Sequence, residues 1–531
     1  MNRRLFLVLI WGLGVMAAAR CGLLQEDLRR VRLSLVDSET GKPVPGVIRC
    51  FVQGQKEAVP IHGLLERGQG VGSVALQQQG KRPPRRPIHD WYVLSEPSQV
   101  TLPKKPLRLE AFAGLETEMA TLEVDLGKRT EASLTLSLNS FSHMKEKQWF
   151  GGNTHLHLFR LNSEEADRYL STIPAADRLD VLFTSYLIRP SEDADYITNR
   201  YPIGDLAQFH STGVLVNQGE EHRHNLTPWS GGYGHVMLLN IRKLIQPVSI
   251  GPGITGAGTD GIPLQEGIDE AHRQGGTAIW CHNDLGLERV VNFVLGKVDA
   301  QNIFDGLSLE DYPQFEDTFY HYLNAGLRVP FSTGTDWFLF DLARAYTRVA
   351  EPLGIASWLD ALKQGRSFIT NGPLFHFLVE DRSIGDTVSL NSPGEVGIEG
   401  RVSGRVDFGH LELIHNGRVV DRIPSRATGD HFSAELKTMF RVEEPGWLAL
   451  RVSGQADSEY GLPIFGHTSA IHLEVDGRSI RQPAAVDHLR REIQEARATV
   501  ADEALFATSE ERKRVLEIYD RGLAALDGGS R

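Results

Sequence analysis

The stretch GGNTHLHLFR, residues 151–160, contains two histidines separated by a single leucine. Residues i and i+2 of a strand point to the same face, so the rings of His155 and His157 can converge on one metal ion. A lone H-x-H pair is weak evidence, because two exposed or core histidines give the same pattern. The sequence that follows decides between the two interpretations.

Short apolar runs alternate with helical segments from residue 148 to about residue 372. The runs are DVLFTSYL, GVLVNQGEE, HVMLLNI, GTAIWCHN, NIFDGLSLE and LRVPFSTGTDWF, and segments such as PLQEGIDEAHRQ lie between several of them. Strands alternating with helices predict βα units around a parallel sheet or barrel. In such folds chemistry collects at the C-terminal ends of the strands.

Metal-ligating residue types gather at the ends of these predicted strands. They are His155 and His157 after the first strand, Glu221 after GVLVNQG, His235 at the start of HVMLLNI, His282 after GGTAIWC, and Asp336 after RVPFSTGT. Imidazole and carboxylate together suit Zn, Mn or Fe. Successive strand ends that each offer a ligand predict a metal site, with Asp336 within coordinating reach of the distant pair His155 and His157.

The order H-x-H, G-x-E, His, CHN and GTD resembles the polymerase-and-histidinol-phosphatase (PHP) superfamily of metallohydrolases. Its carbaryl-hydrolase-like branch is the most similar, because there the core ends in a segment like GRSFITNGPLF (365–375). A β domain with NGRVV, GWLALRV and GHTSAIHLEV follows in that branch as it does here. The resemblance covers roughly residues 148–480 and implies an α/β fold, a distorted (β/α)7 barrel holding up to three metal ions.

The resemblance also implies roles for individual residues. His155 and His157 match the first metal pair, and Glu221 matches the carboxylate that bridges metals in the family. His282 and Asp336 match the histidine and the aspartate of later motifs, and His235 matches the histidine after the G-x-E strand.

The sequence departs from the family pattern at several ligand positions. Phe338 stands where the last motif has histidine, Ser185 and Tyr186 stand in place of Asp-His, and Ser308 replaces the DGxE carboxylate. Several ligands of a three-ion site are thus absent. We expect one or two ions, with Glu221 as the bridge if there are two.

A metal-activated water is the expected nucleophile. It attacks either a phosphoester or a carbamate or ester bond, of a small-molecule or polymer substrate. Glu221 is central to this chemistry, and Tyr186 and His224 are candidates for proton transfer. The alternative is an exported, non-catalytic protein that binds a carbohydrate or wall polymer through a degenerate metal site.

Other polar residues near the motifs have two interpretations each. His222 and His224 share a strand face and either orient ligands or bind substrate. Arg160 and Arg223 either bind an anionic substrate group or form structural ion pairs. Cys281 precedes His282, and strand alternation predicts that its thiol turns into the core.

The regions on either side of the barrel are predicted from strand and helix patterns. Residues 28–140 and 373–480 are rich in alternating strands and turns, which predicts two β-sandwich domains, the first transthyretin-like or carboxypeptidase-regulatory-like. Residues 484–528 carry helically spaced apolar positions, which indicates a packing or oligomerisation appendage.

Composition and the N-terminal sequence indicate where the protein is located and which partners it does not bind. Residues 1–19 have a basic start and an apolar run ending in small residues, which predicts a signal peptide and a secreted or periplasmic location. A net charge of -12 argues against a nucleic-acid or anionic-membrane partner. With three cysteines in 531 residues the chain is not a disulfide scaffold.

Overall fold

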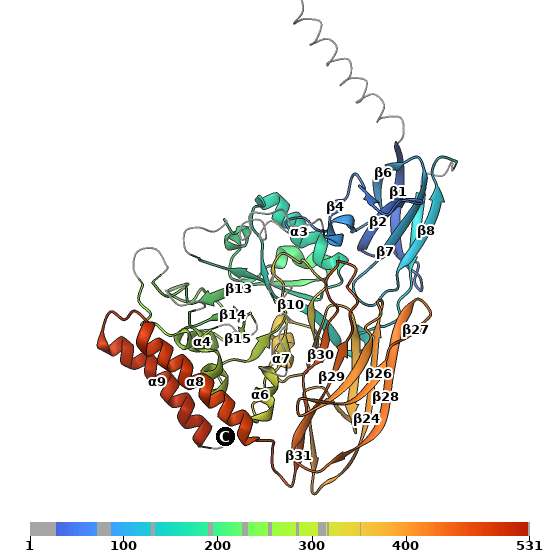
Figure 1. Ribbon diagram of the computed structural model, residues 1–531. Helices are drawn as coiled ribbons and strands as arrows, with labels where there is room; N and C mark the ends of the chain where they lie inside the picture. Colours follow the sequence, from blue (N-terminus) through green and yellow to red (C-terminus); the bar gives the residue numbers. More distant parts are fainter. Residues whose placement is uncertain are drawn as a thin grey trace, which may run out of the picture. The chain divides into compact units, whose positions relative to one another are not determined.

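The computed structural model describes residues 28–71, 86–128, 133–189, 195–225, 232–252, 258–282, 286–305, 315, 318–350 and 352–528. They form a mixed α/β protein with large sheets and few helices (Figure 1). Two compact units are present. The first takes in the described residues of Met1–Gln69, His89–Ala113 and Met119–Ser140, and the second takes in the rest. The predicted signal peptide lies outside the described residues.

Two sheets with a common core form the first unit. One has the order β6–β1–β9 and the other β4–β5–β2–β7–β8, with β3 on β2. Alternate residues of β1 and β9 are buried and pack with buried residues of β2 and β7, as expected for a β-sandwich. The strands are β1 Leu28–Asp37, β2 Gly46–Val52, β3 Ala58–Val59, β4 Leu65–Glu66, β5 Tyr92–Leu94, β6 Ser98–Pro103, β7 Pro106–Phe112, β8 Ala120–Asp125 and β9 Ser133–Leu138.

The second unit is organised around β10 (Trp149–His157), which is buried along its whole length. Hydrogen bonding runs from β10 through β11, β13, β14, β15 and β16 to β17, and β18 pairs with β10 on its other side. These strands are β11 Val181–Tyr186, β13 Leu215–Arg223, β14 His235–Leu239, β15 Thr277–Trp280, β16 Ala300–Asn302, β17 Phe331–Ser332 and β18 Asp336–Trp337, with the short β12 Gly204–Asp205 on β13. Strands are present in the predicted runs, except that of NIFDGLSLE (302–310) only Asn302 belongs to a strand, and residues 306–310 lie outside the described residues.

Strand β14 departs from the expected parallel arrangement. It is antiparallel to both β13 and β15, whereas the pairs β10–β11, β11–β13, β15–β16 and β16–β17 are parallel. His235, the first residue of β14, consequently pairs with Arg223, the last residue of β13. This reversal brings a residue from the start of one strand to the ends of its neighbours.

Helices lie between several of these strands and cover the sheet. They are α3 Ser163–Ala176, α4 Leu264–Arg273, α5 Arg289–Val294, α6 Phe319–Asn324 and α7 Ile355–Lys363, with the short 3-10 turns η1 Pro87–Asp90, η2 Lys145–Lys147, η3 Ile197–Arg200 and η4 Ala207–Thr212. Helix α3 begins with a capping box between Asn162 and Glu165, which satisfies two backbone N–H groups. Helix α4 buries Leu264, Ile268 and Ala271 and lies beside β14 and β15 (Figure 1).

The same sheet continues into the C-terminal β-rich region through β19 (Arg344–Arg348) and β20 (Ser367–Thr370). Strand β20 pairs with β30 (Gly466–Thr468), so the hydrogen bonding crosses the predicted boundary at residue 372 without a break. The rest of this part of the sheet is β23 Thr387–Leu390, β25 His410–His415, β26 Arg418–Pro424, β29 Gly446–Ser453 and β31 Ile471–Val475. A second sheet has the order β22 (Arg382–Ser383), β21 (Leu374–Val379), β24 (Gly394–Gly404), β28 (His431–Val442) and β27 (Arg426–Thr428).

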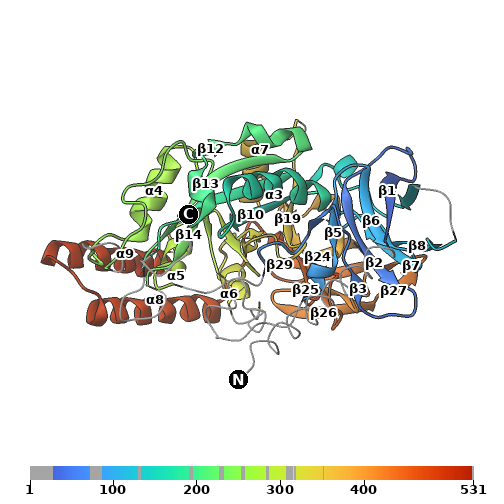
Figure 2. The same cartoon turned by 90° about the horizontal axis from the view of Figure 1, so that it is seen from above.

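The chain ends in a helical hairpin of α8 (Pro483–Glu503) and α9 (Ser509–Asp527), the two red helices side by side in Figures 1 and 2. Their buried residues, among them Leu489, Ile493 and Tyr519, belong to the same core as the sheet residues around β14 and β15. Arg289 of α5 donates hydrogen bonds to Tyr322 and to Glu492 of α8. The hairpin therefore packs on the chain itself.

In the part of the chain that the structure describes, no helix combines the length and the apolar character that crossing a bilayer requires.

Candidate metal centre

Four predicted ligands meet where β10, β13 and β18 end. Potential ligand atoms of His155, His157, Glu221 and Asp336 all lie within 4.8 Å of one another, and all four residues are buried. The Nε2 atom of His157 is 2.8 Å from Oε2 of Glu221, and Nε2 of His155 is 3.3 Å from Oδ1 of Asp336. The juxtaposition that the sequence predicts for Asp336 and the histidine pair is thus present.

A second group of ligand atoms uses the other oxygen of Glu221. Here Nδ1 of His235 is 3.4 Å and Nε2 of His282 is 3.7 Å from Oε1 of Glu221. Potential ligand atoms of these three residues also lie within 4.8 Å of one another. Glu221 therefore lies between two sets of ligands, with one carboxylate oxygen toward each.

Behind His155, on its Nδ1 side, lie Asp305 and Cys281. The Oδ2 atom of Asp305 is 2.9 Å from Nδ1 of His155, and the thiol of Cys281 completes a third group with them. Cys281 is buried in the main hydrophobic core, as expected, but its thiol also lies close to His155 and Asp305, which strand alternation does not predict. Strand β15 ends at Trp280 and His282 has a left-handed backbone (φ 57°), so strand alternation no longer applies at this position.

Two of the ligands have an unusual backbone conformation. His282 and Asp336 have φ values of 57° and 58°, in the left-handed region that residues other than glycine seldom adopt. Such conformations cost of order 1–3 kcal/mol and persist where the surrounding structure enforces them, commonly at functional sites. His282 lies two residues after the end of β15, and Asp336 begins the two-residue strand β18.

The electrostatics of the centre are dominated by burial and by the mutual contacts of these residues. Burial alone would raise the pKa of Glu221, but its contacts with the rings of His155, His157 and His282 hold that pKa well below its usual value. Burial and the nearby Arg223 guanidinium lower the pKa of His235 well below the usual value. The centre is thus arranged around an ionised Glu221 and a neutral His235, which are the forms that bind metal ions.

Several buried polar atoms of the two groups have no hydrogen-bond partner among the described residues. They are Oε1 of Glu221, Nδ1 of His235 and Oδ1 of Asp336. Buried polar atoms in proteins are nearly always paired, so three such atoms in one centre require an explanation. A divalent cation in each group would satisfy these atoms, and the buried His, Glu and Asp groups could hold such ions.

One edge of the centre carries aromatic and cationic side chains. The ring of Trp337 lies 5.2 Å from that of His157 and stacks on Tyr196, with the Arg189 guanidinium 5.6 Å from its centroid. Arg223 is 7% exposed, its Nη1 is 3.6 Å from Oε1 of Glu221, and its Nε is buried without a hydrogen-bond partner among the described residues.

Strand alternation divides the residues of β13 between two faces. Glu221 and Arg223 face the centre, whereas Glu220, His222 and His224 lie on the other face. There Glu220 accepts one hydrogen bond from the backbone N–H of Ile245 and contacts the His222 ring at 2.9 Å. His224 is 2.8 Å from the carboxylate of Asp260. The structure therefore does not bring His224 to the metal groups.

The other predicted residues occupy separate places. Tyr186 ends β11 in register with Glu220, on the face opposite to Glu221. Arg160 is exposed and lies over the ring of Phe159. Phe338 is buried against Phe159 and Tyr169. Ser308 lies outside the described residues.

Sequence reasoning missed Asp305. It is completely buried among the site residues and contacts both His155 and His282. The signal was available, since Asp305 follows the predicted strand in NIFDGLSLE and the strand-end criterion that selected Asp336 applies to it equally. The family motif drew attention instead to the missing carboxylate at position 308.

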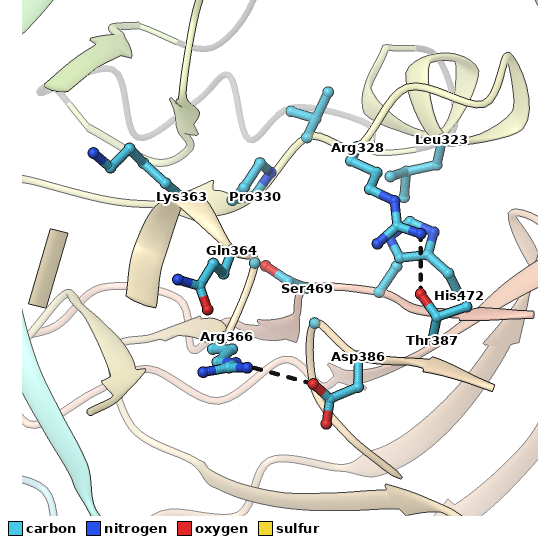
Figure 3. Close-up of a pocket in the computed structure, with 14 residues that line it drawn as sticks. Leu323, Arg328, Pro330, Lys363, Gln364, Arg366, Asp386, Thr387, Ser469 and His472 are labelled. Atoms are coloured by element: carbon cyan, nitrogen blue, oxygen red, sulfur yellow. Dashed lines mark hydrogen bonds and ion pairs between the residues drawn. The ribbon is translucent and has the colours of Figure 1, made fainter. Parts of the chain in front are cut away.

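A cavity of about 350 Å³ lies elsewhere in the second unit (Figure 3). Its cationic residues Arg328, Lys363 and Arg366 already have partners. Arg328 donates to the Thr387 hydroxyl at 2.9 Å, Arg366 is 3.9 Å from Asp386, and Lys363 is 2.9 Å from Asp360. None of the metal-centre residues lines this cavity.

Comparisons of the chain with protein-family models, with curated proteins and with solved structures each find no match.

Proposed function

We propose that this protein is a metal-dependent hydrolase whose active site is the centre around Glu221. The observation that carries the proposal is the position of the Glu221 carboxylate between two buried sets of ligands, one set on each oxygen. His155, His157 and Asp336 would hold one ion, and His235 and His282 a second. Zn, Mn or Fe suits these ligands.

A distorted PHP-type barrel is the fold we propose for the region around β10. The circuit of pairings from β10 to β17, together with the return of β18 to β10, supports it. The resemblance of the motif order to the PHP superfamily points the same way. The reversed strand β14 would account for part of the distortion.

A bound divalent ion would supply Lewis acidity and would lower the pKa of a water molecule toward neutrality. The protein contributes the surroundings. Burial of the ligands excludes bulk water, which strengthens every electrostatic interaction within the centre. Arg223 lies beside Glu221, where its guanidinium can stabilise negative charge that develops on the substrate.

Arg223 also bears on the bond that is cleaved. A buried guanidinium is costly without an anionic partner, and in a metal-loaded centre Glu221 would be engaged by the ions. A phosphoester, which carries its own negative charge, would provide that partner. We therefore place a phosphoester first, and a carbamate or carboxylic ester second.

The test combines metal analysis with a substrate panel. The purified protein is dialysed, its metal content is measured, and it is assayed with p-nitrophenyl phosphate, bis-p-nitrophenyl phosphate, p-nitrophenyl acetate and an aryl N-methylcarbamate. We expect one to two ions per chain, turnover of a phosphoester, and loss of both in Glu221→Gln. Glu220→Gln is the matched control, because that carboxylate faces away from the centre.

Two results would contradict the proposal. Metal content below one ion in ten chains would remove the metal centre, since the ligands would then be no more than a buried polar cluster. Normal metal content with no turnover of any substrate would favour the non-catalytic binding protein.

A further inference from the structure

We propose that Asp305 is a positioning residue that orients His155 and His282 together and so couples the two halves of the metal centre. The inference rests on the proposed metal centre, but it concerns a residue that is not among the ligands matched to the family motifs. It follows from the contacts of the two Asp305 oxygens.

The first contact determines which ring nitrogen of a neutral His155 carries the proton. Oδ2 of Asp305 is 2.9 Å from Nδ1 of His155, and Nε2 of the same ring points toward His157, Glu221 and Asp336. A neutral imidazole carries one proton and one lone pair. With Nδ1–H donated to Asp305, the lone pair is on Nε2 and faces the metal ligands.

The second contact fixes the backbone and ring of His282. The backbone N–H of His282 donates to Oδ1 of Asp305 at 2.8 Å, and Nδ1 of its ring is 3.6 Å from the same oxygen. His282 has the left-handed φ of 57°, which needs support from its surroundings. Asp305 provides that support and leaves Nε2 of His282 directed toward Oε1 of Glu221.

Asp305 is itself held in place. Its side chain is fully buried, and Nδ2 of Asn302 donates to Oδ2 at 3.1 Å. One carboxylate thus receives a ring N–H from the first ligand group and a backbone N–H from the second. Partners of this kind orient metal-binding histidines, and their loss typically lowers metal affinity 10–100-fold.

The experiment compares Asp305→Asn with a matched control, Asp299→Asn. Asp299 also accepts from a histidine ring (Nε2 of His272, 3.0 Å) and from a backbone N–H (Ala278, 2.8 Å), but His272 belongs to none of the metal groups. Zn²⁺ affinities are measured by chelator competition, and the Co²⁺-loaded proteins are compared by visible spectroscopy. We expect the affinity of Asp305→Asn for both ions to fall together, by about 10–100-fold, and its Co²⁺ spectrum to change. Asp299→Asn should retain both properties.

The metal-free proteins give an independent readout. In protein labelled with ¹⁵N-histidine, wild type should show a protonated Nδ1 signal that disappears in both His155→Gln and Asp305→Asn. If wild type binds no ion but this signal depends on Asp305, the proposed function fails while the positioning of His155 stands.

Three results would overturn the inference. They are an unchanged His155 signal in Asp305→Asn, unchanged affinity for both ions, or a loss confined to one ion. Asp305→Glu, which keeps the charge, should recover part of the affinity if Asp305→Asn folds. If Asp305→Asn does not fold, Asn302→Ala provides the milder test, because it keeps the Asp305 carboxylate and removes the donor that holds it, together with an acceptor for the Thr154 hydroxyl. The affinity for both ions should then fall to a smaller extent.

Discussion

The alternation of side chains along β13 sets what each residue can do. Glu221 and Arg223 share the inner face, while Glu220 and His222 interact with each other on the outer face. A shift of the strand by one residue would exchange the two sets. The buried pairing of Glu220 with the backbone of Ile245 resists such a shift, because Glu220 would lose this partner.

Arg223 should determine preference between anionic and neutral substrates. Replacing Arg223 with Gln removes a charge-assisted hydrogen bond worth about 1.5–3 kcal/mol, so kcat/KM for a phosphoester should fall roughly 10–100-fold. Arg223→Lys should recover part of this, because it keeps the charge but loses the fork geometry. Steady-state kinetics on p-nitrophenyl phosphate and p-nitrophenyl acetate give the comparison, with the exposed Arg160→Gln as control. An equal loss on both substrates would mean that Arg223 has a structural role only.

His467 should make the protein sensitive to acid. It is buried, accepts a hydrogen bond from the Tyr320 hydroxyl at 2.8 Å and contacts the Thr468 carbonyl at 2.7 Å, and burial lowers its pKa to about 3. Below the unfolded pKa of about 6.5 the unfolded chain takes up a proton that the folded protein does not, so stability is lost as the pH falls. Between pH 6.5 and 5 the loss from this residue is about 2 kcal/mol.

Urea unfolding of wild type and His467→Gln at pH 7 and pH 5 checks this. The glutamine side chain of the variant cannot titrate, so its free energy of unfolding should fall by about 2 kcal/mol less between the two pH values than that of wild type. His62→Gln, at an exposed site, should behave as wild type. A parallel decline of His467→Gln and wild type would contradict the prediction.

At the level of single residues the sequence predicted which ligand-type side chains come together better than it predicted their surroundings. His155, His157, Glu221, His235, His282 and Asp336 were all found by strand ends and motif order, and all lie in the two ligand groups. The direction of Cys281 depends on a left-handed backbone at His282, which strand alternation does not include. Alternation along β13 already places His224 on the face opposite to Glu221. It was predicted to act at the site because it lies only three residues from Glu221 in the sequence.

Among the elements, the link between β17 and β18 packs closely against β10 at Gly334. A Cβ atom at Gly334 would lie 2.4 Å from Cβ and 2.7 Å from the backbone N of His155. Neither contact can be relieved by rotating a side chain. The absence of a side chain at this position therefore allows Asp336 to approach the histidine pair.

Gly334→Ala should consequently disturb the metal centre. The added methyl group forces β10 and the β17–β18 link apart, and overpacking of this kind typically costs 1–3 kcal/mol. Metal affinity should fall with stability, because His155 and Asp336 lie on the two separated segments. Gly394→Ala is the control, since its Cβ would meet only an ordinary 3.6 Å contact. Thermal unfolding and chelator competition measure the two effects, and a variant with normal values of both would contradict the tight fit.

The helical hairpin gives a prediction of its own. Ile493 of α8 is 1% exposed within the main core, so Ile493→Ala should destabilise the protein by about 2–5 kcal/mol without changing its oligomeric state. Leu505→Ala, at a residue 52% exposed between the helices, should have little effect. Thermal unfolding and sedimentation velocity distinguish this from an oligomerisation appendage, whose loss of packing would dissociate subunits instead.

Element types were predictable from sequence, whereas one strand direction was not. HVMLLNI is an apolar run that reads the same whether the strand runs parallel or antiparallel to its neighbours. The reversal of β14 is visible only in its pairing with β13 and β15. This reversal explains why His235 lies at a strand start while the other ligands lie at or near strand ends.

At the scale of the whole molecule, the sequence predicted separate domains where the structure has a continuous sheet. Composition and turn residues separate residues 148–372 from 373–480, but the pairing of β20 with β30 joins them. The pairing of strands about 100 residues apart, as between Phe368 and Thr468, leaves no local trace in the sequence. The sequence alone therefore predicts the strands of this unit but not the strand pairing that joins its two parts.

Export is a further proposal at this scale. The basic start and apolar run of residues 1–19 should direct secretion, with cleavage after Ala19. N-terminal sequencing of protein purified from its native cells should return Arg20 as the first residue. A first residue of Met1 in a soluble cytoplasmic fraction would contradict it.

The position of β10 between early and late parts of the chain has a kinetic consequence. On one side β10 pairs with β11, which follows soon after it, and on the other side it is joined to a segment 182 residues away through the Asn153–Thr335 hydrogen bond. Contacts with such high sequence separation form slowly, because a long loop must close before they contribute. Tight binding of an ion would then require that these distant segments have come together. During refolding, uptake of Co²⁺ should therefore lag behind the appearance of secondary structure.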